Sequence, residues 1–483
     1  MMDALARPTE DSGQRLRDPT RRVFVNRNLR MERIRWVGFD MDYTLAAYDR
    51  RTLEPLIFQR AAERLVEAHG YPEEVARLDY DPDFVVRGLV VDRRLGNILK
   101  MDRHQHVGRV FHGTRRLDKE ERRKQYRGQK IRLSAPRYHW IDTLFALPEA
   151  GLYAKLVDLY ETQLDVGRVA FGKLFDDVRR ANDEVHADGT LKQAILEDLD
   201  RYLPRDPSLA STLHKLRSSG KRTFLLTNSE QSFTEAVMRH MLDDHSGDYP
   251  NWKAFFDFVV VDARKPGFFT GKESLLDPQS FKPISRLSTK GIYRGGSFRH
   301  VEQLLGDEGG EQVLYVGDHI YGDIIRTKKE GLWRTALVLS ELERELHTLE
   351  GVQESSQALI RLEAQRAEVD DRIADCKERL SQLAEGPERD LVRRGLEEAK
   401  ARLRTLVEET RGLQRDIDAA FNPHWGSVFK EGSEVTRFGR QVEKFACVYT
   451  SRVGNLFGYS PAQYFRAPRH WMAHEKTLGP QDA

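Results

Sequence analysis

The chain has 483 residues, of which 39% are apolar and 32% are charged. One hydrophobic core does not grow to this size, so the length predicts roughly two to four domains. The 78 basic and 76 acidic side chains nearly cancel to a net charge of +2, and this balance excludes a dedicated nucleic-acid binder.

Five short β-like runs each end at a polar cluster. They occupy residues 34–39, 223–226, 256–261, 313–316 and 335–339, and stretches with helical spacing separate them. This alternation predicts a parallel sheet that helices cover on both faces. Active sites of open α/β sheets lie beyond the carboxyl ends of the strands, so the polar residues at these ends should face one crevice. These residues are Asp40, Thr227, Asp262 and Asp318.

The first and second runs are separated by roughly 180 residues, which is too long for one ordinary crossover connection. This interval therefore predicts a cap domain that folds over the crevice. It contains helical patterns at residues 60–67, 150–160 and 174–186 and a charged stretch at 115–132. The expected organisation is a polar tail at residues 1–21, a catalytic core at 22–50 and 215–345, and the cap at 51–214.

Two leucine-rich series follow the fifth run, at residues 359–383 and 396–417, mostly with spacings of three and four. The turn-forming pair Gly386-Pro387 lies between them, so we expect an antiparallel helical hairpin over residues 346–420. The hairpin could bury its seam within one chain, or it could join chains into a homo-oligomer, a dimer or a tetramer. We expect the oligomer. Residues 421–483 bring back Asn, Pro, Gly and aromatic side chains and should pack on the core.

An acidic pair, Asp40 and Asp42, follows the first run directly. One carboxylate of such a pair can attack phosphorus. The other can protonate the departing oxygen and later deprotonate the attacking water. Aspartates at a strand end can also simply cap a helix or begin a turn, so the pair alone leaves both interpretations open.

Two further segments occur in the strand contexts that this chemistry requires. Thr227-Asn228-Ser229, after the second run, offers hydroxyl, amide and backbone donors to phosphate oxygens, although a helix cap would use the same residues. Lys265, after the third run, supplies a compact positive charge for the nucleophile and the transferring phosphoryl group. A lone lysine there would usually be a solvated loop residue.

The last such segment, residues 317–323, follows the fourth run and contains Asp318 and Asp323, each preceded by a glycine. Carboxylate oxygens are the ligands that Mg²⁺ prefers, so Asp318 and Asp40 form a candidate metal pair.

Together these segments resemble the four motifs of the haloacid dehalogenase superfamily, in sequence order. The amino-acid sequences of residues 40–46, 261–266 and 317–319 are similar to those of the cytosolic purine 5′-nucleotidase family, and the resemblance extends from residues 22–27 to 465–467. It implies an α/β fold: a Rossmann-like parallel core of the haloacid dehalogenase type, with a large cap inserted between the first two strands and a C-terminal helical hairpin.

The resemblance also implies the catalytic roles. Asp40 would be phosphorylated, Asp42 would be the acid and base, and Lys265 would assist. The cofactor would be Mg²⁺, held by the carboxylate of Asp40, the backbone carbonyl of Asp42 and the carboxylate of Asp318, with Asp323 in support. Phosphate contacts would fall on Thr227, Asn228, Ser229 and Lys265.

Base recognition would lie in the cap, where residues 175–186 resemble a helix of the family. Arg179 and Asp183 stand four apart and project from one face, as a donor and an acceptor suited to hypoxanthine or guanine. Spacing alone would favour an intrahelical salt bridge. Phe145 matches an aromatic residue that stacks on the base, with His186 opposite, although without the family Phe145 would be assigned to the core. Lys192 matches a lysine of the substrate site.

Some members of the family bind an activating nucleotide such as ATP at a second site. Arg132 and Gln441 match that site, whereas Asp142, Tyr321 and Lys444 stand where the family has Asn, Phe and Arg. A carboxylate beside a polyphosphate is unfavourable, and lysine cannot reproduce the bidentate geometry of arginine. These departures argue against activation by ATP.

The expected function is Mg²⁺-dependent hydrolysis of purine nucleoside 5′-monophosphates, with IMP and GMP preferred, through an aspartyl-phosphate that water or a nucleoside accepts. One alternative is a phosphatase of the same superfamily that acts on another phosphomonoester, because the core motifs do not specify the leaving group. The other is a scaffold whose hairpin binds a partner and whose phosphatase core is vestigial.

Cysteine usage and hydropathy indicate the compartment. The two cysteines, Cys376 and Cys447, have no partner at ligand spacing, which fits a reducing environment. The first twenty residues contain no apolar core, and no apolar run approaches the ~18 residues that cross a bilayer. We therefore expect a cytoplasmic protein without a membrane segment.

Overall fold

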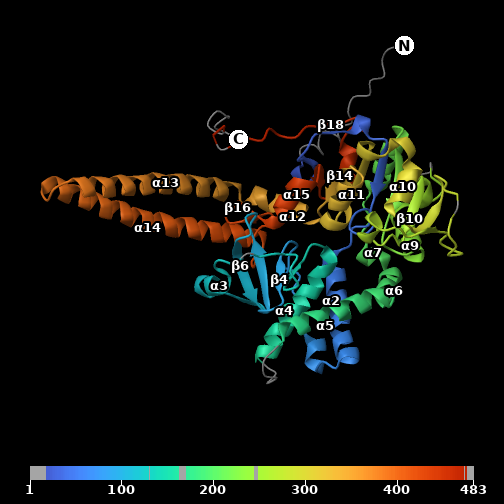
Figure 1. Ribbon diagram of the computed structural model, residues 1–483, viewed down its shortest axis with the longest axis horizontal. Helices are drawn as coiled ribbons and strands as arrows, with labels where there is room; N and C mark the ends of the chain where they lie inside the picture. Colours follow the sequence, from blue (N-terminus) through green and yellow to red (C-terminus); the bar gives the residue numbers. More distant parts are fainter. Residues whose placement is uncertain are drawn as a thin grey trace, which may run out of the picture.

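The computed structural model describes residues 18–129, 131–162, 170–243, 249–284, 286–472 and 474–475. Its body contains a nine-stranded sheet, and two long helices extend away from that body (Figure 1). Residues 1–17, which form most of the predicted polar tail, and residues 476–483 lie outside the described part.

The nine-stranded sheet is parallel except at its two edges. Seven neighbouring strands run in one direction, while β1 and β11 pair antiparallel at the edges. In spatial order the strands are β1 (Phe24–Val25), β17 (Val448–Thr450), β14 (Arg334–Val338), β13 (Val313–Gly317), β3 (Trp36–Phe39), β9 (Arg222–Leu226), β10 (Phe258–Val261), β12 (Ile292–Gly295) and β11 (Leu275–Leu276). The five predicted runs correspond to β3, β9, β10, β13 and β14.

The central strands are buried on both faces. On β10, Val259 and Val261 join one hydrophobic core, while Phe258 and Val260 join a second core on the other face. Helices α8 (Leu209–Ser218) and α9 (Gln231–Leu242) contribute to the first core, and α10 (Phe298–Leu305) contributes to the second. Double-sided burial explains the continuous apolar runs in the sequence. The predicted α/β class with a mostly parallel sheet is confirmed.

The long insertion between β3 and β9 contains both helices and a second sheet. Helices α2, α4 and α5 pack on one another and include the helical patterns predicted at residues 60–67, 150–160 and 174–186. The inserted elements are α2 (Arg50–His69), β4 (Val90–Asp92), β5 (Asn97–Met101), β6 (Val107–His112), β7 (Arg115–Arg116), α3 (Lys119–Tyr126), β8 (Tyr138–Trp140), α4 (Leu147–Thr162), α5 (Phe171–Ala187), α6 (Thr190–Glu197) and α7 (Leu199–Tyr202). In Figure 1 they lie below the nine-stranded sheet.

The second sheet, in the order β7-β6-β5-β4-β8, is antiparallel and was not predicted. Its strand β5 carries Lys100, a charged residue that is 2% exposed. The Lys100 ammonium donates to the carbonyl oxygens of Trp425, Ser427 and Lys430 at 2.6, 2.7 and 2.6 Å. These three acceptors replace water around the buried charge, and they join the inserted sheet to the chain that follows the hairpin.

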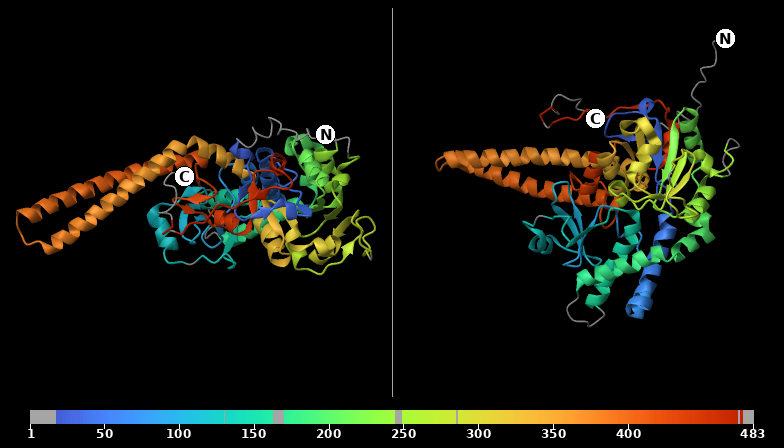
Figure 2. Two further views of the ribbon diagram at one scale, coloured as in Figure 1. Left: turned by 90° about the horizontal axis from the view of Figure 1, so that it is seen from above. Right: turned by 45° about the vertical axis from the view of Figure 1, so that its right-hand side comes forward.

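The predicted hairpin consists of α13 (Gln353–Gln382) and α14 (Pro387–Phe421), which follow α12 (Glu341–Gly351). The two long helices pack along a narrow seam that includes Ile373, Leu396 and Ala399, and they project from the body in both views of Figure 2. The chain then returns through β15 (Lys430–Glu431), β16 (Glu434–Val435), α15 (Arg437–Phe445) and β18 (Tyr464–Phe465), and β17 enters the main sheet beside β14. The predicted domain boundaries stay predictions.

Short elements complete the described chain. No helix in the described ranges is both long and apolar enough to cross a membrane. The short elements are η1 (Pro19–Arg21), β2 (Leu29–Arg30), η2 (Met31–Arg33), η3 (Glu73–Arg77), η4 (Leu144–Ala146), η5 (Trp252–Phe255), η6 (Gly267–Phe269), η7 (Gly306–Glu308), η8 (Gly310–Gln312), the π-helix η9 (Ile320–Ile325), α11 (Arg326–Glu330) and η10 (Val453–Gly458).

Candidate active site

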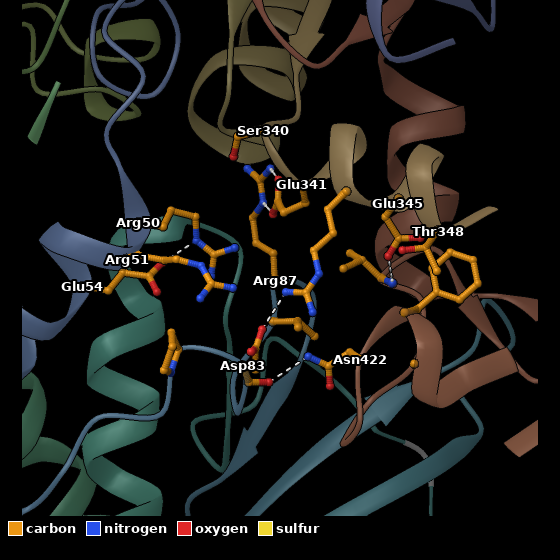
Figure 3. Close-up of a pocket in the computed structure, with 16 residues that line it drawn as sticks. Arg50, Arg51, Glu54, Asp83, Arg87, Ser340, Glu341, Glu345, Thr348 and Asn422 are labelled. Carbon is orange, nitrogen blue, oxygen red and sulfur yellow. Dashed lines mark hydrogen bonds and ion pairs between the residues drawn. The ribbon is translucent and has the colours of Figure 1, made fainter. Parts of the chain in front are cut away.

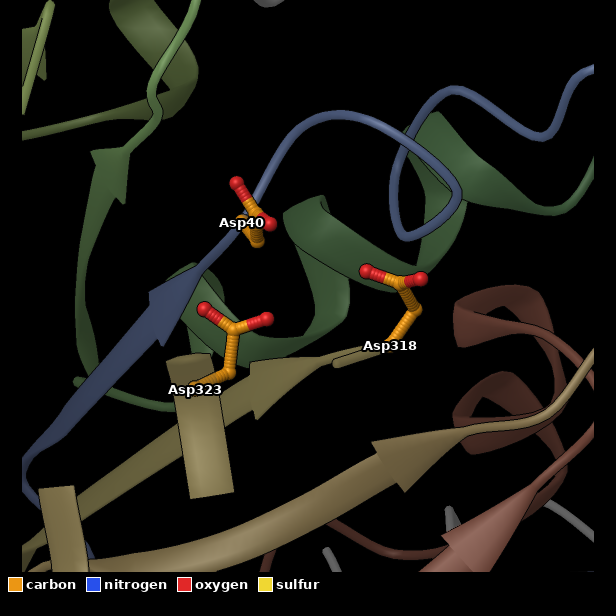
Figure 4. Close-up of side chains that lie close together, drawn as sticks. All are labelled: Asp40, Asp318 and Asp323. Carbon is orange, nitrogen blue, oxygen red and sulfur yellow. The ribbon is translucent and has the colours of Figure 1, made fainter. Parts of the chain in front are cut away.

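Three buried carboxylates meet at the carboxyl edge of the main sheet. Asp40 follows β3, Asp318 follows β13, and Asp323 lies in η9, one turn beyond Asp318. One oxygen from each carboxylate lies within 4.8 Å of the other two. Figure 4 shows the three side chains directed toward one another. Parallel neighbouring strands bring these residues together because their carboxyl ends share one edge.

Burial raises the pKa of Asp40 well above its ordinary value, and the charges of Asp323 and Asp318 raise it further, against the opposing effect of Lys265. Burial also raises the pKa of Asp318 to about 7, with Asp323 as the next cause. Like charges held this close disfavour full ionisation unless a cation joins them. Three convergent carboxylates of this kind suit a hard divalent cation such as Mg²⁺.

Lys265 bridges two members of the cluster. Its Nζ lies 2.9 Å from Oδ1 of Asp40 and 2.7 Å from Oδ1 of Asp323, and it donates to the hydroxyl of Tyr315 at 3.1 Å. Burial disfavours the ammonium, but Asp323 and Asp40 raise the pKa of Lys265 well above its ordinary value. The lysine is therefore charged and fixed beside the candidate nucleophile.

Glycine at position 317 allows Asp323 to approach β13. A Cβ atom at Gly317 would lie 2.6 Å from the Cβ of Asp323, which is too close for two carbon atoms. Oδ2 of Asp323 accepts from the backbone N–H of His319 at 3.2 Å, while Oδ1 accepts from Lys265. Asp323 thus holds Lys265 and the loop of residues 317–323 together. This loop carries the candidate metal ligands Asp318 and Asp323, and we call it the metal-ligand loop.

The two acids of the first motif have different surroundings. Both described contacts of the Asp40 carboxylate, from the Met41 N–H at 2.7 Å and from Lys265, fall on Oδ1. Asp42 accepts from the hydroxyls of Tyr48 and Ser229, each at 2.7 Å. Burial raises the pKa of Asp42, although both hydrogen bonds oppose the rise. Asp40 therefore has one oxygen without a described contact, whereas Asp42 is held in one orientation.

The predicted phosphate-binding segment also organises this edge of the sheet. Asn228 donates to the Lys265 carbonyl at 3.0 Å and accepts from the Lys265 N–H at 2.6 Å. Thr227 is buried, and its hydroxyl accepts from the Ser229 N–H at 3.0 Å. The phosphate contacts of the three residues stay predictions. Asp262, which we expected to face the crevice, pairs with Arg294 of β12 at 3.0 Å, and its position at the crevice stays a prediction.

The predicted base-stacking residues lie together. The Phe145 and His186 rings meet edge to face, with centroids 5.7 Å apart and planes at 89°. Phe145 also contacts Tyr43, at 4.8 Å between centroids, so it adjoins the loop that carries Asp42. Phe145 and His186 thus lie together beside the first motif.

Arg179 and Asp183 do not form the intrahelical salt bridge in the described structure. The guanidinium of Arg179 lies 3.7 Å from Glu149 and contacts His139 at 3.1 Å. Lys192 lies 3.5 Å from Glu230, and its charge also acts on Asp42. Arg179 and Asp183 are both exposed, which leaves them accessible to a ligand.

Four of the five predicted effector residues lie in the metal-ligand loop or in segments that contact it. Asp142 lies 3.2 Å from His319, Tyr321 lies in η9, and Gln441 and Lys444 lie in α15, which packs on η9. Arg132 is exposed, and no described contact joins it to the other four. The effector site stays a prediction.

The model of the 5′ nucleotidase family matches residues 23–477. The chain belongs to this family. It is 30% identical over 469 residues to a 5′-nucleotidase domain-containing protein of Dictyostelium discoideum, covering 94% of this chain and 75% of that protein. It is 31% identical over 474 residues to 5′-nucleotidase domain-containing protein 2 of Rattus norvegicus, covering 94% of this chain and 80% of that protein.

Among solved structures, the magnesium-bound Bacillus subtilis protein YfnB, described as a HAD-hydrolase, matches 63% of this chain and 88% of its own at 16% identity. The TM-score of 0.22 is too low for this likeness to carry an argument. Family membership and the sheet topology confirm the resemblance read from the sequence and the predicted enzyme class, a 5′-nucleotidase.

Some residues of this 5′-nucleotidase family site were missed from the sequence. Tyr48 and Tyr315 look like ordinary loop and strand aromatics, yet their hydroxyls face Asp42 and Lys265. Glu149 and Arg87 lie outside every motif, and no spacing pattern distinguishes them. Glutamate two residues into a helix normally indicates only a favourable helix start, and Glu149 stands at that position in α4.

The burial of Glu149 predicts that the stability of the protein depends on pH. It is 4% exposed, and burial raises its pKa from about 4.5 in the unfolded chain to about 7. Its contribution to stability is therefore present below pH 4.5 and is lost as pH rises through 7. As pH rises from 4.5 to 7, the free energy of unfolding of Glu149→Gln should increase by on the order of 3 kcal/mol relative to that of the wild type. Urea unfolding at pH 5 and pH 8 measures this change, and an equal difference at both pH values would show that the site is not buried as described.

Proposed function

We propose that the protein is a Mg²⁺-dependent 5′-nucleotidase that hydrolyses purine nucleoside 5′-monophosphates, preferring IMP and GMP, through phosphorylation of Asp40. Water, or a second nucleoside, accepts the phosphoryl group from Asp40. The observation that carries this proposal is the cluster of Asp40, Asp318 and Asp323 with Lys265 bonded into it. Family membership supports a nucleotide as the substrate.

The carboxylates of Asp40 and Asp318 would hold Mg²⁺, with Asp323 in support. The bound ion would supply positive charge to the phosphoryl oxygens. The hard oxygen donors and their mutual distances fit this ion. Lys265 neutralises part of the negative charge and holds Asp40 through Oδ1, which leaves Oδ2 to attack phosphorus.

Asp42 is suited to move the proton. Its raised pKa favours a protonated carboxyl that can donate to the departing nucleoside oxygen. The resulting carboxylate then deprotonates the water that attacks the aspartyl-phosphate. Tyr48 and Ser229 keep this side chain aligned through both steps, because each donates to one of its two oxygens.

The preference for purines is proposed from the cap residues. Phe145 adjoins the first motif through Tyr43, so a base stacked there would lie close to the reacting phosphate. Arg179 and Asp183 would read the edge of the base as a donor and an acceptor. The homo-oligomer and the cytoplasmic location also stay predictions.

Asp40→Asn tests the nucleophile. The amide keeps the shape of the side chain but cannot attack phosphorus, so kcat for phosphate release from IMP should fall at least about a thousandfold. Chelation of Mg²⁺ should abolish release in the wild type, and added Mg²⁺ should restore it. The matched control is Asp262→Asn, which changes another strand-end aspartate that pairs with Arg294. Wild-type turnover by Asp40→Asn would refute the mechanism.

Arg179→Ala tests base recognition. Loss of a charged hydrogen bond costs about 1.5–3 kcal/mol, so kcat/KM for IMP and GMP should fall roughly 10- to 100-fold. Turnover of a simple aryl phosphate should change little. Arg180→Ala is the control, because Arg180 is the next residue of α5 and pairs with Asp177 at 3.8 Å. An equal loss on both substrates would favour a phosphatase of another phosphomonoester.

The scaffold alternative assigns the function to partner binding by the hairpin and treats the phosphatase core as vestigial. All the residues that the chemistry requires are present at the site, which argues against a vestigial core. Phosphate release by a variant that lacks residues 357–417 separates the role of the hairpin from the chemistry.

A further inference from the structure

Arg87 carries a buried charge that the chemistry above does not use. It lies in the inserted segment, just before β4, and its side chain is 0% exposed. Nη1 donates to the backbone carbonyl of Asp318 at 2.8 Å and lies 3.8 Å from Oδ2 of the same residue. An arginine from the insertion therefore contacts the metal-ligand loop of the core directly.

The other side of the guanidinium is anchored. Nε and Nη2 of Arg87 donate to the two carboxylate oxygens of Glu341, the first residue of α12, at 2.7 and 2.5 Å. The Phe438 ring of α15 lies against the guanidinium, 5.3 Å from its centre. Two parallel bonds and a ring contact fix the plane of the group, which the single ammonium of a lysine cannot reproduce.

The neighbouring ion pairs have no described bond to Asp318. Arg87 and Glu341 line a cavity of about 210 Å³, together with the pairs Arg50–Glu54 and Arg344–Asp83 (Figure 3). Arg344 lies 2.6 Å from Asp83 and is half exposed, and no described contact joins it to the metal-ligand loop. Within the cavity wall, Arg87 is thus distinguished by its bond to Asp318.

We propose that Arg87 is a positioning residue that holds the Asp318 main chain, and with it the direction of the Asp318 carboxylate toward Asp40 and Asp323. The inference rests on the proposed function, because Asp318 acts there as a ligand of Mg²⁺. Groups that orient metal ligands typically change metal affinity or activity 10- to 100-fold when they are removed. Arg87 makes the geometry of the metal site depend on the position of the inserted segment.

A purely structural tether would behave differently. The Arg87–Glu341 pair also joins the insertion to α12, so its loss could lower the melting temperature without changing the metal site. Removing Arg87 alone would in addition leave Glu341 buried and unpaired, which is strongly destabilising. The test must therefore measure Mg²⁺ binding separately from folding, and it must remove both charges together.

The experiment compares the full-length wild type with Arg87→Met/Glu341→Leu, Arg87→Lys and Arg344→Met. Apolar replacement of a whole buried ion pair is often neutral for stability. We expect the double variant to fold and its Kd for Mg²⁺, from calorimetric titration without substrate, to rise about 10- to 100-fold. Arg87→Lys should show a smaller rise, and it provides the measurement if the double variant does not fold. Arg344→Met should bind Mg²⁺ as the wild type does.

Phosphate release provides the second readout. The Mg²⁺ concentration for half-maximal activity should rise in the double variant while KM for the nucleotide stays unchanged. Wild-type Mg²⁺ affinity in the folded double variant would overturn the inference, as would a wild type that binds no Mg²⁺. If Mg²⁺ affinity falls as expected but the wild type hydrolyses no nucleotide, the positioning role stands and the proposed function fails.

Discussion

The Lys265 ammonium lies between two buried carboxylates, 2.9 Å from Asp40 and 2.7 Å from Asp323. The Arg87 guanidinium, 3.8 Å from Asp318, is already paired with Glu341. With Asp318 ionised as well, three negative charges would therefore meet the one positive charge of Lys265, so two unit charges would be uncompensated. Burial and mutual repulsion accordingly raise the pKa of Asp40 and Asp318. An excess of two negative charges, presented by hard oxygen donors, is the charge balance that suits a divalent cation.

The rest of the structure maintains this charge cluster. Asp40 comes from β3, Lys265 from the loop after β10, and Asp323 from η9 after β13, so the neighbouring parallel strands β13, β3, β9 and β10 must all be in place for the group to form. Asn228, after β9, fixes the Lys265 backbone between them. The insertion leaves the core after β3 and returns at β9, and from it Phe145 contacts Tyr43 in the loop after β3 while Arg87 contacts Asp318 after β13.

The catalytic edge could be predicted from the sequence because each of its residues directly follows an apolar strand, and parallel strands bring such positions together. Asp262 also follows an apolar strand directly, but its carboxylate pairs with Arg294 and no described contact joins it to the cluster. The inserted sheet was missed in part because its strand β5 carries two polar residues, Asn97 and Lys100, and only the tertiary structure supplies the carbonyl oxygens that solvate the buried Lys100 charge. Arg87 was missed for a similar reason: its partners lie more than 200 residues away in the chain.

Trapping the phosphorylated enzyme tests most directly whether Asp40 receives the phosphoryl group. Asp42→Asn removes the carboxylate that deprotonates the attacking water, and an aryl phosphate has a leaving group that needs little protonation. With Mg²⁺ and a labelled aryl phosphate, this variant should accumulate phosphate on the peptide that contains Asp40, and hydroxylamine should remove it. Phosphate on a different residue, or steady phosphate release without any labelled protein, would contradict a mechanism through Asp40.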